Sequence, residues 1–467
     1  MSENGASDYL VVGAGAMGMA FTDVLMNETD ATVTIVDRHG RPGGHWNDSY
    51  PFVRLHQPSS FYGVNSRVLG TNQKDLVGLN AGLYELASGS EVVMYFEQVM
   101  NQQFLPTGRV KYLPMCEYIG NGTVRNLISG VETHCEAKKT VDATYMNVTV
   151  PSVTTPSYKV SQGVTCIPPN GLPEIGDTPG DYVVVGGGKT AIDSCLWLLG
   201  NGVNPDAIRW IVPRDQWMLD RASIQPGEEF AVQALLRQVE TMEIVAESVS
   251  MDQMFDELVQ RGALLQLDHS VRPTMYRCCT VTVAELDELR RIHNVVRLGR
   301  VQTIGLDHID LDHGQIPTTS DTVHVDCTAD GLANRPVRPI FEPGHLTLQT
   351  VRTCQQVFSA ALIAHVEATY DDDETKNEIC KVVPHPNDTL DWVRTTMDNA
   401  LNSIRWNSDP DLKEWLSNAR LDGFSRARRD GVRDPSQKEL VARIMEATPV
   451  ALSKLDQYLK EGRGIGG

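Results

Sequence analysis

Two glycine-rich turns in this chain could each hold the phosphates of a dinucleotide. Residues 9–18 read YLVVGAGAMG and residues 182–191 read YVVVGGGKTA, so each turn follows a β-branched run and opens a helical pattern. In the pattern G-x-G-x-x-G/A, the first glycine permits the tight turn, the second lets the backbone approach a pyrophosphate, and the third position packs helix against strand. Two such turns predict two bound dinucleotides, typically a flavin and a nicotinamide. The glycines concerned are Gly13, Gly15, Gly18, Gly186 and Gly188.

After each glycine turn and its helix comes a second predicted strand, and the residue close behind that strand distinguishes the two expected cofactors. Asp37 follows the run 31–36, about nineteen residues past the first turn, where an acid hydrogen-bonds ribose hydroxyls. Arg214 follows the run 208–212, and an arginine there can pair with a ribose 2′-phosphate. We therefore expect FAD or NAD at the first turn and NADP at the second. Solvated side chains without a ligand are the alternative, and Asp215 could neutralise its neighbour.

The elements around the two turns repeat in the same order. Short strands with turns fill residues 109–147 and again 295–331, and each set ends in a buried run followed by Asp-Ala-Thr or Asp-Cys-Thr. These patterns predict an α/β fold of two Rossmann-like dinucleotide-binding domains with β-meander inserts and added helices. The Pro-, Thr- and Gly-rich segment 154–180 would cross between the domains. Arg38 and Asp326, each at a strand end, are further expected cofactor contacts.

The predicted domains are discontinuous in sequence. Residues 1–160 would form the first part of the FAD-binding domain, 161–320 the NADP-binding domain, and 321–467 the rest of the FAD-binding domain with C-terminal helices. Helical periodicity predicts a mostly helical insert in the NADP-binding domain at about 226–295. A long apolar-periodic helix is expected over 346–368. The helices expected in the insert are 228–247, 251–262 and 282–294.

Charge and cysteine content exclude several classes of protein. Of 467 residues, 41 are Lys or Arg and 60 are Asp or Glu, which gives a net charge of −19. Nucleic acids and anionic membranes favour a basic face, so neither is an expected partner. The N-terminus shows no signal-peptide pattern and no apolar run reaches transmembrane length, so we expect a cytoplasmic protein.

The nine cysteines are scattered and include no C-x-x-C pair. Neither a metal site nor a disulfide framework is therefore expected. The adjacent Cys278 and Cys279 are expected as two buried thiols, with a vicinal disulfide as the alternative.

The stretch after the first strand-end acid carries a family resemblance. Residues 43–62 read GGHWNDSYPFVRLHQPSSFY, which resembles the flavin-domain motif G-G-x-W, then Y-P-G-x-x-x-D-x-x-S-x-x-Y, of Baeyer–Villiger and related class B flavin monooxygenases. Residues 212–217, VPRDQW, are similar to the family's NADPH fragment, in which an arginine holds the 2′-phosphate. The resemblance covers most of the chain and implies bound FAD and NADPH. The positions that carry it are Gly43, Gly44, Trp46, Tyr50, Pro51, Ser59, Tyr62 and Thr190; Lys189 and His45 adjoin them as expected cofactor contacts.

The activity implied by the resemblance is that of an oxidoreductase. NADPH would deliver hydride to FAD, and the reduced flavin would react with molecular oxygen, most simply as a monooxygenase acting through a flavin peroxide on a small-molecule substrate. His56 stands where the family has a flavin-contacting acid, and 158–163 lacks the histidine of the family's linker signature, so ketone oxygenation does not follow. His56, Gln57 and Tyr62 are the expected catalytic residues. Structural roles are the alternatives for His56 and for Trp46.

Two other functions stay open from the sequence. One is an FAD-dependent oxidase or reductase that does not oxygenate, and the other is a nucleotide-binding protein without catalysis. A disulfide reductase of this fold would need a redox cysteine pair just after the second strand, and residues 38–62 contain no cysteine. No motif specifies the substrate or the oligomeric state, although the helical insert and residues 334–349 are expected to border the substrate pocket.

Overall fold

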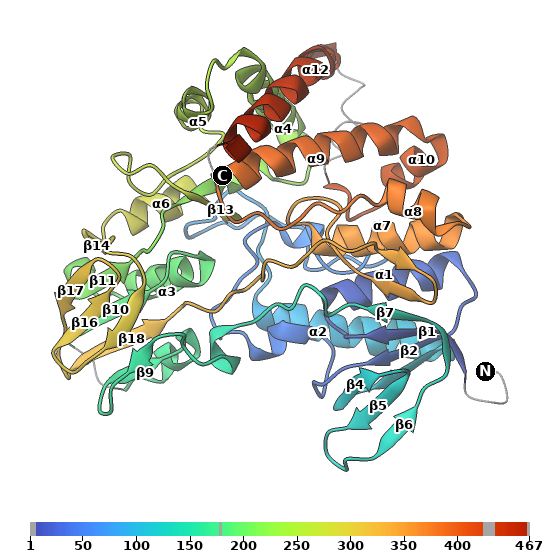
Figure 1. The fold of residues 1–467 in the computed structure, drawn as a ribbon, viewed down its shortest axis with the longest axis horizontal. Coiled ribbons are helices and arrows are strands. Elements are labelled where there is room, and N and C mark those ends of the chain that lie inside the picture. The colour runs from blue at the N-terminus through green and yellow to red at the C-terminus, as the bar shows by residue number, and fades with distance from the viewer. Residues whose placement is uncertain (1–5, 177–179, 424–434, 465–467) are drawn as a thin grey trace.

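A six-stranded, largely parallel sheet organises the N-terminal part of the computed structural model, which describes residues 6–176, 180–423 and 435–464 (Figure 1). In sheet order its strands are β19 (Phe341–Glu342), β20 (His345–Thr347), β7 (Ala137–Asp142), β1 (Ser7–Val12), β2 (Val33–Val36) and β3 (Val110–Leu113). β1 pairs in parallel with β2 and β7, while β19 and β20 form an antiparallel hairpin. The first sheet therefore takes strands from two separate parts of the chain.

Alternation along the strands gives the first sheet two apolar faces. Val11, Val33 and Ile35 pack in one core with α1 (Ala16–Glu28), α2 (Gly89–Val99) and α7 (Gln356–Thr369). Leu10 and Val36 point the other way, because neighbouring side chains in a strand alternate between faces. They pack against a small antiparallel meander, which consists of β4 (Cys116–Gly120), β5 (Thr123–Asn126) and β6 (Glu132–His134).

The second sheet repeats this arrangement with five parallel strands. In sheet order they are β14 (Asn294–Val296), β11 (Ile208–Ile211), β10 (Asp181–Val185), β18 (Thr322–Asp326) and β9 (Thr165–Ile167). One face packs against α3 (Lys189–Gly200) and α6 (Val283–Leu289). The other packs against a second meander of β15 (Val301–Ile304), β16 (His308–Leu311) and β17 (Gly314–Pro317), which β8 (Lys159–Val160) extends. The predicted α/β fold with two dinucleotide-binding units and two meanders is confirmed; the domain boundaries at 160 and 320 stay predictions.

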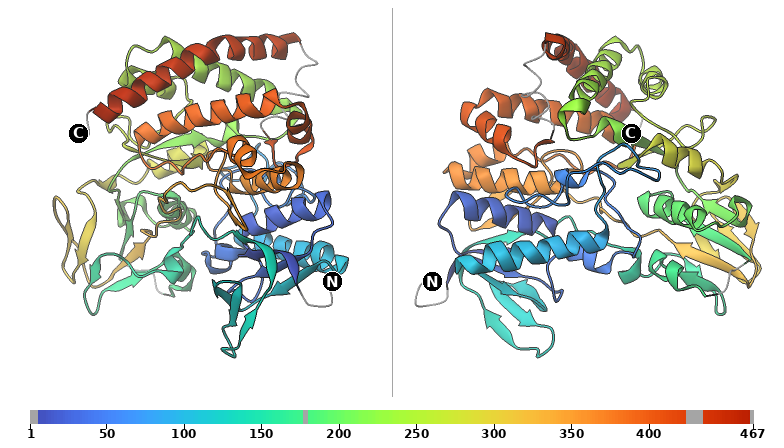
Figure 2. Two further views of the ribbon diagram at one scale, coloured as in Figure 1. Left: turned by 45° about the vertical axis from the view of Figure 1, so that its right-hand side comes forward. Right: turned by 180° about the vertical axis from the view of Figure 1, so that it is seen from behind.

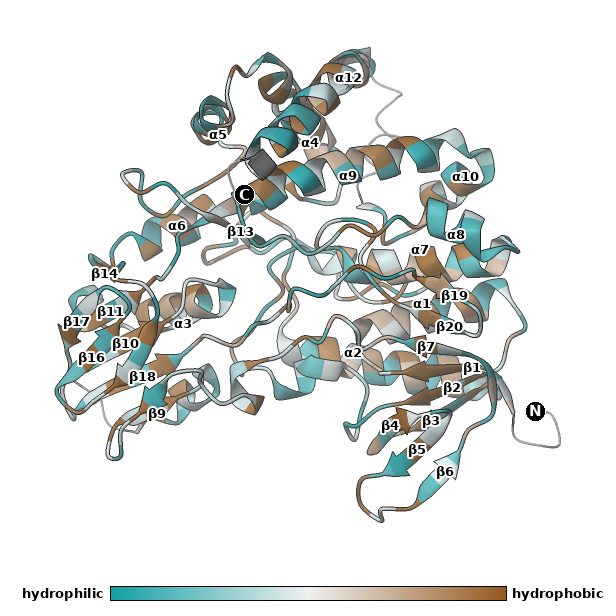
Figure 3. Ribbon diagram, viewed as in Figure 1, coloured by the Kyte–Doolittle hydropathy of each residue, from teal (hydrophilic) through white to brown (hydrophobic). Residues whose placement is uncertain are grey.

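The insert and the C-terminal helices share a third core. It contains Trp217, Phe255, Trp392 and Tyr458, from four separate segments. Figure 2 shows the C-terminal helices as a layer above the two sheets. In Figure 3, polar and apolar patches alternate along α9 (Thr389–Ser408) and α12 (Pro435–Gly464), as expected for helices with one packed face. The elements are β12 (Gln216–Asp220), α4 (Glu228–Glu247), α5 (Met251–Gln260), β13 (Met275–Val281), α8 (Asp373–Ile379), α9 (Thr389–Ser408), α10 (Pro410–Asn418) and α12 (Pro435–Gly464).

The insert contains α4, α5 and α6 (Val283–Leu289), in agreement with the prediction that it is mostly helical, together with the strand β13, which pairs in parallel with β12. Two other local predictions are wrong. The helix predicted over 346–368 begins only at Gln356, since the preceding residues LTLQTV alternate in the period of a strand and partly form β20. Cys278 is neither a free thiol nor bonded to Cys279; it forms a disulfide with Cys354, 76 residues further on. Within the described ranges, no helix combines the length and apolarity needed to cross a membrane.

Candidate dinucleotide-binding site

The first glycine turn connects β1 to α1 in the predicted way. Gly13 has a φ of +104°, which side-chain-bearing residues rarely adopt. A Cβ on Gly18 would overlap the carbonyl oxygen of Gly13, so helix and strand approach too closely for any side chain. Gly15 precedes α1 and caps it with no side-chain hydrogen bond. The free N–H groups of this helix end, together with its dipole, favour a bound anion such as a pyrophosphate.

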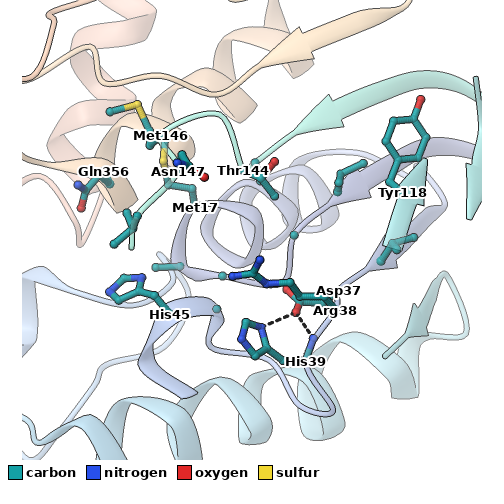
Figure 4. A pocket seen from close by; sticks show the side chains of 18 of the residues that line it. Met17, Asp37, Arg38, His39, His45, Tyr118, Thr144, Met146, Asn147 and Gln356 are labelled. Carbon is teal, nitrogen blue, oxygen red and sulfur yellow. Dashed lines mark hydrogen bonds and ion pairs between the residues drawn. The ribbon is translucent and has the colours of Figure 1, made fainter. Parts of the chain in front are cut away.

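A cavity of about 340 Å³ opens at this turn (Figure 4). Its volume is in the range of ligand sites in proteins. Backbone of the turn forms part of its wall, and the loop after β7 and the first residue of α7 form others. Of the residues predicted to bind the flavin cofactor or act in catalysis, the lining includes Gly13, Gly15, Asp37, Arg38, Gly44, His45 and Tyr62.

Sequence reasoning missed several residues of this cavity, among them His39, Tyr118, Met146, Asn147 and Gln356. They come from loops, from strand β4 and from the start of α7, outside the glycine turn itself, so the pattern of that turn does not mark them. Thr144 also lines the cavity. Its position was marked by the repeated Asp-Ala/Cys-Thr strand ending, which could have identified it.

Asp37 lies at the edge of the cavity and is 6% exposed. Its Oδ2 accepts a hydrogen bond from the Ala14 N–H at 2.6 Å, and its Oδ1 accepts one from the His39 N–H at 2.7 Å. The His39 ring lies 2.9 Å from Asp37 and 2.8 Å from Asp48, and the hydrogen bond to Asp37, followed by that to Asp48, raises the pKa of His39 against the opposing effect of burial. Because a carboxylate has about four acceptor positions and three hydrogen bonds already reach Asp37, its carboxylate keeps about one position for a ribose hydroxyl.

Residues 44–48 form a 3-10 turn that presses against the first glycine turn. A Cβ on Gly44 would lie 2.9 Å from the Cα of Gly15, so Gly44 has no room for a side chain, whereas a Cβ on Gly15 would lie 3.6 Å from the Cα of Gly44, an ordinary contact. Trp46 donates its indole N–H to the Tyr62 hydroxyl at 2.8 Å. Burial lowers the pKa of His45 to about 4 and raises that of Tyr62 well above its ordinary value. This end of the cavity is therefore an uncharged aromatic wall near neutral pH.

His56 and Gln57 are not part of the cavity lining; the loop that carries them faces the second unit. The His56 carbonyl accepts a hydrogen bond from the buried Arg221, and the buried Nδ1 of His56 has no hydrogen-bond partner among the residues that the structure describes. Burial, aided by the charges of Lys189 and Arg221, lowers the pKa of His56 to about 3, so its ring is neutral. The Ser59 hydroxyl accepts a hydrogen bond from the Ala87 N–H and donates one to the Glu85 carbonyl, so it binds the backbone of residues 85–87.

The second glycine turn has the same backbone frame. Gly186 has a φ of +133°, and a Cβ there would lie 2.8 Å from the carbonyl oxygen of Cys327. Gly188 faces open space, with nothing within 4 Å of an added Cβ. Lys189 and Thr190 begin α3, but the Lys189 ammonium pairs with Asp193 in the next turn of that helix. The second turn thus offers backbone to a ligand and directs its lysine elsewhere.

Arginine side chains gather at the strand end beside the second turn. The carbonyl oxygen of Arg214 lies 2.9 Å from where a Cβ on Gly187 would be, and its guanidinium donates to the Asn387 side chain at 3.0 Å. Burial and then the charges of Arg300 and Arg277 lower the pKa of Arg214. In the described part of the chain, no carboxylate forms an ion pair with Arg214.

Asp215 does not neutralise this arginine group. Both of its carboxylate oxygens accept from Arg297, at 2.8 and 3.0 Å. Arg277 is paired with Asp330 at 2.6 Å, and the charge of Asp388 also acts on Arg214. Among the described carboxylates none forms an ion pair with Arg214 or Arg300, so these two side chains are the members of the group that could meet an anion. Asp326, also predicted to bind a cofactor, is 4% exposed and accepts from the Tyr158 hydroxyl at 3.0 Å and from Thr328, so the structure gives it partners within the protein.

The fold and these sites define a protein with two dinucleotide-binding units. A known family of nucleotide-binding domains matches part of the first unit. Residues 11–59 match the family described as an NAD(P)-binding Rossmann-like domain. The uncharacterized protein Rv2000 of Mycobacterium tuberculosis is 54% identical over 415 residues, which cover 89% of this chain and 77% of the relative. The uncharacterized protein Mb2023 of Mycobacterium bovis matches with the same values. At this identity and coverage, the chain belongs to the same family as these mycobacterial proteins.

Solved structures similar to this one include flavin-dependent enzymes at low identity. A flavin-containing monooxygenase from Stenotrophomonas maltophilia is 14% identical, with a TM-score of 0.46, over 80% of this chain and 99% of that one. Cyclohexanone monooxygenase from Rhodococcus sp. Phi1 bound to NADP⁺ is 14% identical, with a TM-score of 0.46, over 97% and 98% of the two chains. Because these scores are low, the proposals below rest on the residues of the site.

Proposed function

We propose that this protein is an FAD- and NADPH-dependent oxidoreductase that acts as a monooxygenase on a small organic substrate. The observation that carries the proposal is the pair of glycine turns at the ends of β1 and β10, one beside an acid and the other beside a group of arginines. An acid suits ribose hydroxyls, whereas arginines suit a 2′-phosphate. The two turns are therefore suited to different dinucleotides.

The first turn is proposed to hold FAD. The N–H groups at the start of α1 and the open backbone at Gly15 would hold its pyrophosphate, and Asp37 would accept hydrogen bonds from the ribose. His45, Tyr62 and Gln356 line the same cavity and would border the rest of the cofactor. When bound, the flavin supplies hydride acceptance and oxygen chemistry. The neutral side chains of His45 and Tyr62 would keep charge and water away from it.

The second turn is proposed to hold NADPH. Gly188 would let the backbone approach the pyrophosphate, because nothing occupies the space in front of it. Arg214, supported by Arg300 and Arg277, would pair with the 2′-phosphate, and Asn387 orients its guanidinium at 3.0 Å. The arginine group would also discriminate against NADH, which lacks that phosphate.

Whether the reduced flavin transfers oxygen to a substrate is to be decided by experiment. NADPH consumption and oxygen uptake would be followed with a panel of ketones, amines and sulfides, and hydrogen peroxide would be measured in parallel. The proposal expects at least one compound to gain one oxygen atom per NADPH oxidised, with little peroxide. If every oxygen molecule consumed appears as hydrogen peroxide, the protein is instead an FAD-dependent oxidase. The replacement of the family's acid by His56 favours this second candidate.

A further inference from the structure

His39 bridges two carboxylates at the edge of the first proposed cofactor site. Its Nδ1 lies 2.9 Å from Oδ1 of Asp37, and its Nε2 lies 2.8 Å from Oδ2 of Asp48. Figure 4 shows the His39 ring beside Asp37 in the wall of the cavity. Asp37 follows β2, whereas Asp48 ends the turn of residues 44–48. The ring therefore connects the proposed ribose-binding acid to a second part of the cavity wall.

This geometry suits a His39 ring that is protonated on both nitrogens. A neutral imidazole has one N–H group and one lone pair. Whichever nitrogen kept the proton, the lone pair of the other would face a carboxylate oxygen at 2.8 or 2.9 Å, which is repulsive. The imidazolium instead donates to both Asp37 and Asp48, and charge-assisted hydrogen bonds of this kind are strong. His39 is therefore the positive centre of the bridge.

The backbone at both ends of the bridge is held in place. The His39 carbonyl accepts a hydrogen bond from the Met115 N–H at 3.0 Å. The Asp48 carbonyl accepts hydrogen bonds from the side chains of Ser152 and Asn170. Because neither end is free to move far, loss of the second ring proton is expected to act as repulsion within the bridge.

Both ends of the bridge belong to the wall of the cavity at the first glycine turn. Asp37 lines the cavity directly, and the turn that Asp48 ends contributes Gly44 and His45. Repulsion at one end would turn the Asp37 carboxylate away from a ribose, and repulsion at the other would shift Gly44 from its close contact with Gly15. A neutral ring would also leave two carboxylates beside a negatively charged pyrophosphate without a cation between them. Each of these changes weakens the binding of FAD.

We propose that His39 is a positioning residue whose imidazolium holds Asp37 and the turn of residues 44–48 in place for FAD, so that affinity for FAD falls when the ring loses its second proton; this inference rests on the proposed function. The hydrogen bonds to Asp37 and Asp48 raise the pKa of His39 above its ordinary value of 6.5, against the effect of burial. Strong binding is therefore expected at low pH and is lost as pH rises through this raised pKa.

Other ionisable side chains lie around the bridge. Among the described residues of the cavity lining, two more are of a type that titrates near neutral pH: His45, whose pKa burial lowers to about 4, and Cys116 on β4. The other ionisable side chains near the bridge or in the lining beside it are Arg38, Arg41, Glu97, Tyr112 and Glu117. Cys116 is therefore the group from which an effect of His39 has to be distinguished.

The test measures how tightly the full-length protein holds FAD in a pH series from about 6 to about 9. The FAD-loaded protein is diluted at each pH, and the fluorescence of the released FAD gives the dissociation constant. In the wild type this constant is expected to rise about three- to ten-fold across the series. His39→Gln cannot gain the charge, so it is expected to bind FAD more weakly than the wild type at about pH 6 and to show no such rise.

A wild-type dissociation constant that stays the same across the pH series overturns this inference, and so does a rise that persists in His39→Gln. Both outcomes leave FAD binding, and with it the proposed function, intact. A protein that neither carries FAD nor takes it up at any pH overturns the proposed function instead.

Three further variants assign the effect to the bridge. In Asp48→Asn, an amide N–H can donate to Nε2 while the Nδ1–H group donates to Asp37, so a neutral ring satisfies both partners. The rise with pH is therefore expected to shrink. Cys116→Ser should keep the wild-type pH profile whatever its absolute affinity, and His134→Gln, at an exposed histidine of the first meander, should keep both. A profile that Asp48→Asn leaves unchanged, or that Cys116→Ser flattens, overturns the role of His39.

Discussion

The two glycine turns share a backbone frame and differ in what surrounds it. In both, the first glycine has a positive φ and the second opens onto free or cavity space. The first turn needs Gly18, because helix and strand touch there, whereas the second accommodates Ala191 in its core. Asp37 accepts a hydrogen bond from the backbone of the first turn. Arg214 lies beside the second turn and forms no ion pair with any carboxylate of the described residues. The frame thus sets where a dinucleotide binds, and the residue after the following strand sets which one.

The largest effects are expected from a bulky side chain at the second glycine of either turn, because the two substitutions should affect different cofactors. Gly15→Val would place methyl groups where the pyrophosphate must approach, so we expect loss of FAD binding, seen as loss of flavin absorbance in the purified protein. Gly188→Val is the matched variant at the second turn, where nothing lies within 4 Å of an added Cβ, whereas at Gly15 an added Cβ would lie 3.6 Å from the Cα of Gly44. It should retain FAD and lose reduction by NADPH. A Gly15→Val protein that stays yellow would contradict the assignment of FAD to the first turn.

Arg214→Ala tests the choice of nicotinamide. Losing a charge-assisted phosphate contact costs about 1.5–3 kcal/mol, or roughly ten- to a hundred-fold in affinity. The preference for NADPH over NADH in flavin reduction should therefore fall by that factor. Arg209→Ala is the control, because Arg209 lies on β11, the strand that precedes Arg214, but binds the carbonyl of Pro317. Equal use of both nucleotides by the wild type would remove Arg214 from phosphate recognition.

His56→Ala asks whether the loop between the two units acts in hydride transfer. The buried neutral ring of His56 lies near the charges of Lys189 and Arg221. Its removal should therefore disturb the contact between this loop and the residues of the second unit. We expect slower flavin reduction by roughly three- to ten-fold with FAD still bound. His134→Ala, at an exposed position in the first meander, is the control. Unchanged rates of flavin reduction and reoxidation would leave His56 with a structural role.

The smallest expected effect is a pH dependence at the first turn. Asp37 and Asp48 raise the pKa of His39 in the folded state above its unfolded value of 6.5. The protonated ring therefore contributes stability to the folded state. That contribution is fully present below pH 6.5 and is lost as pH rises through the folded-state pKa. The difference in Tm between wild type and His39→Gln should be larger at about pH 6 than at about pH 9. A difference that does not change with pH would show that His39 is not charged in this site.

Local patterns were enough to predict the parts of the fold that depend on neighbours in sequence. The glycine turns, both meanders and helix α4, at Glu228–Glu247, follow from short runs of residues. β13 escaped prediction because it lies within a helical segment and is interrupted by a bulge. The Cys278–Cys354 bond joins residues 76 positions apart, and such pairing depends on how the C-terminal helices pack against the insert.

The candidate site divides in the same way. Gly13, Gly15 and Asp37 were predicted from spacing, and the cavity contains all three. Gln356 and Met146 reach that cavity from other parts of the chain, so sequence spacing could not identify them. The arginine group is similar, because Arg214 was visible from its motif while the arginines that reinforce it come from β13 and from the loop before β15.

The most direct test of the account is anaerobic mixing of the purified protein with NADPH and, separately, with NADH. The account predicts an equimolar amount of bound FAD, released on denaturation, and loss of its absorbance on mixing, faster with NADPH. A colourless protein that cannot be reconstituted with FAD would contradict it, and so would bound FAD that neither nucleotide reduces.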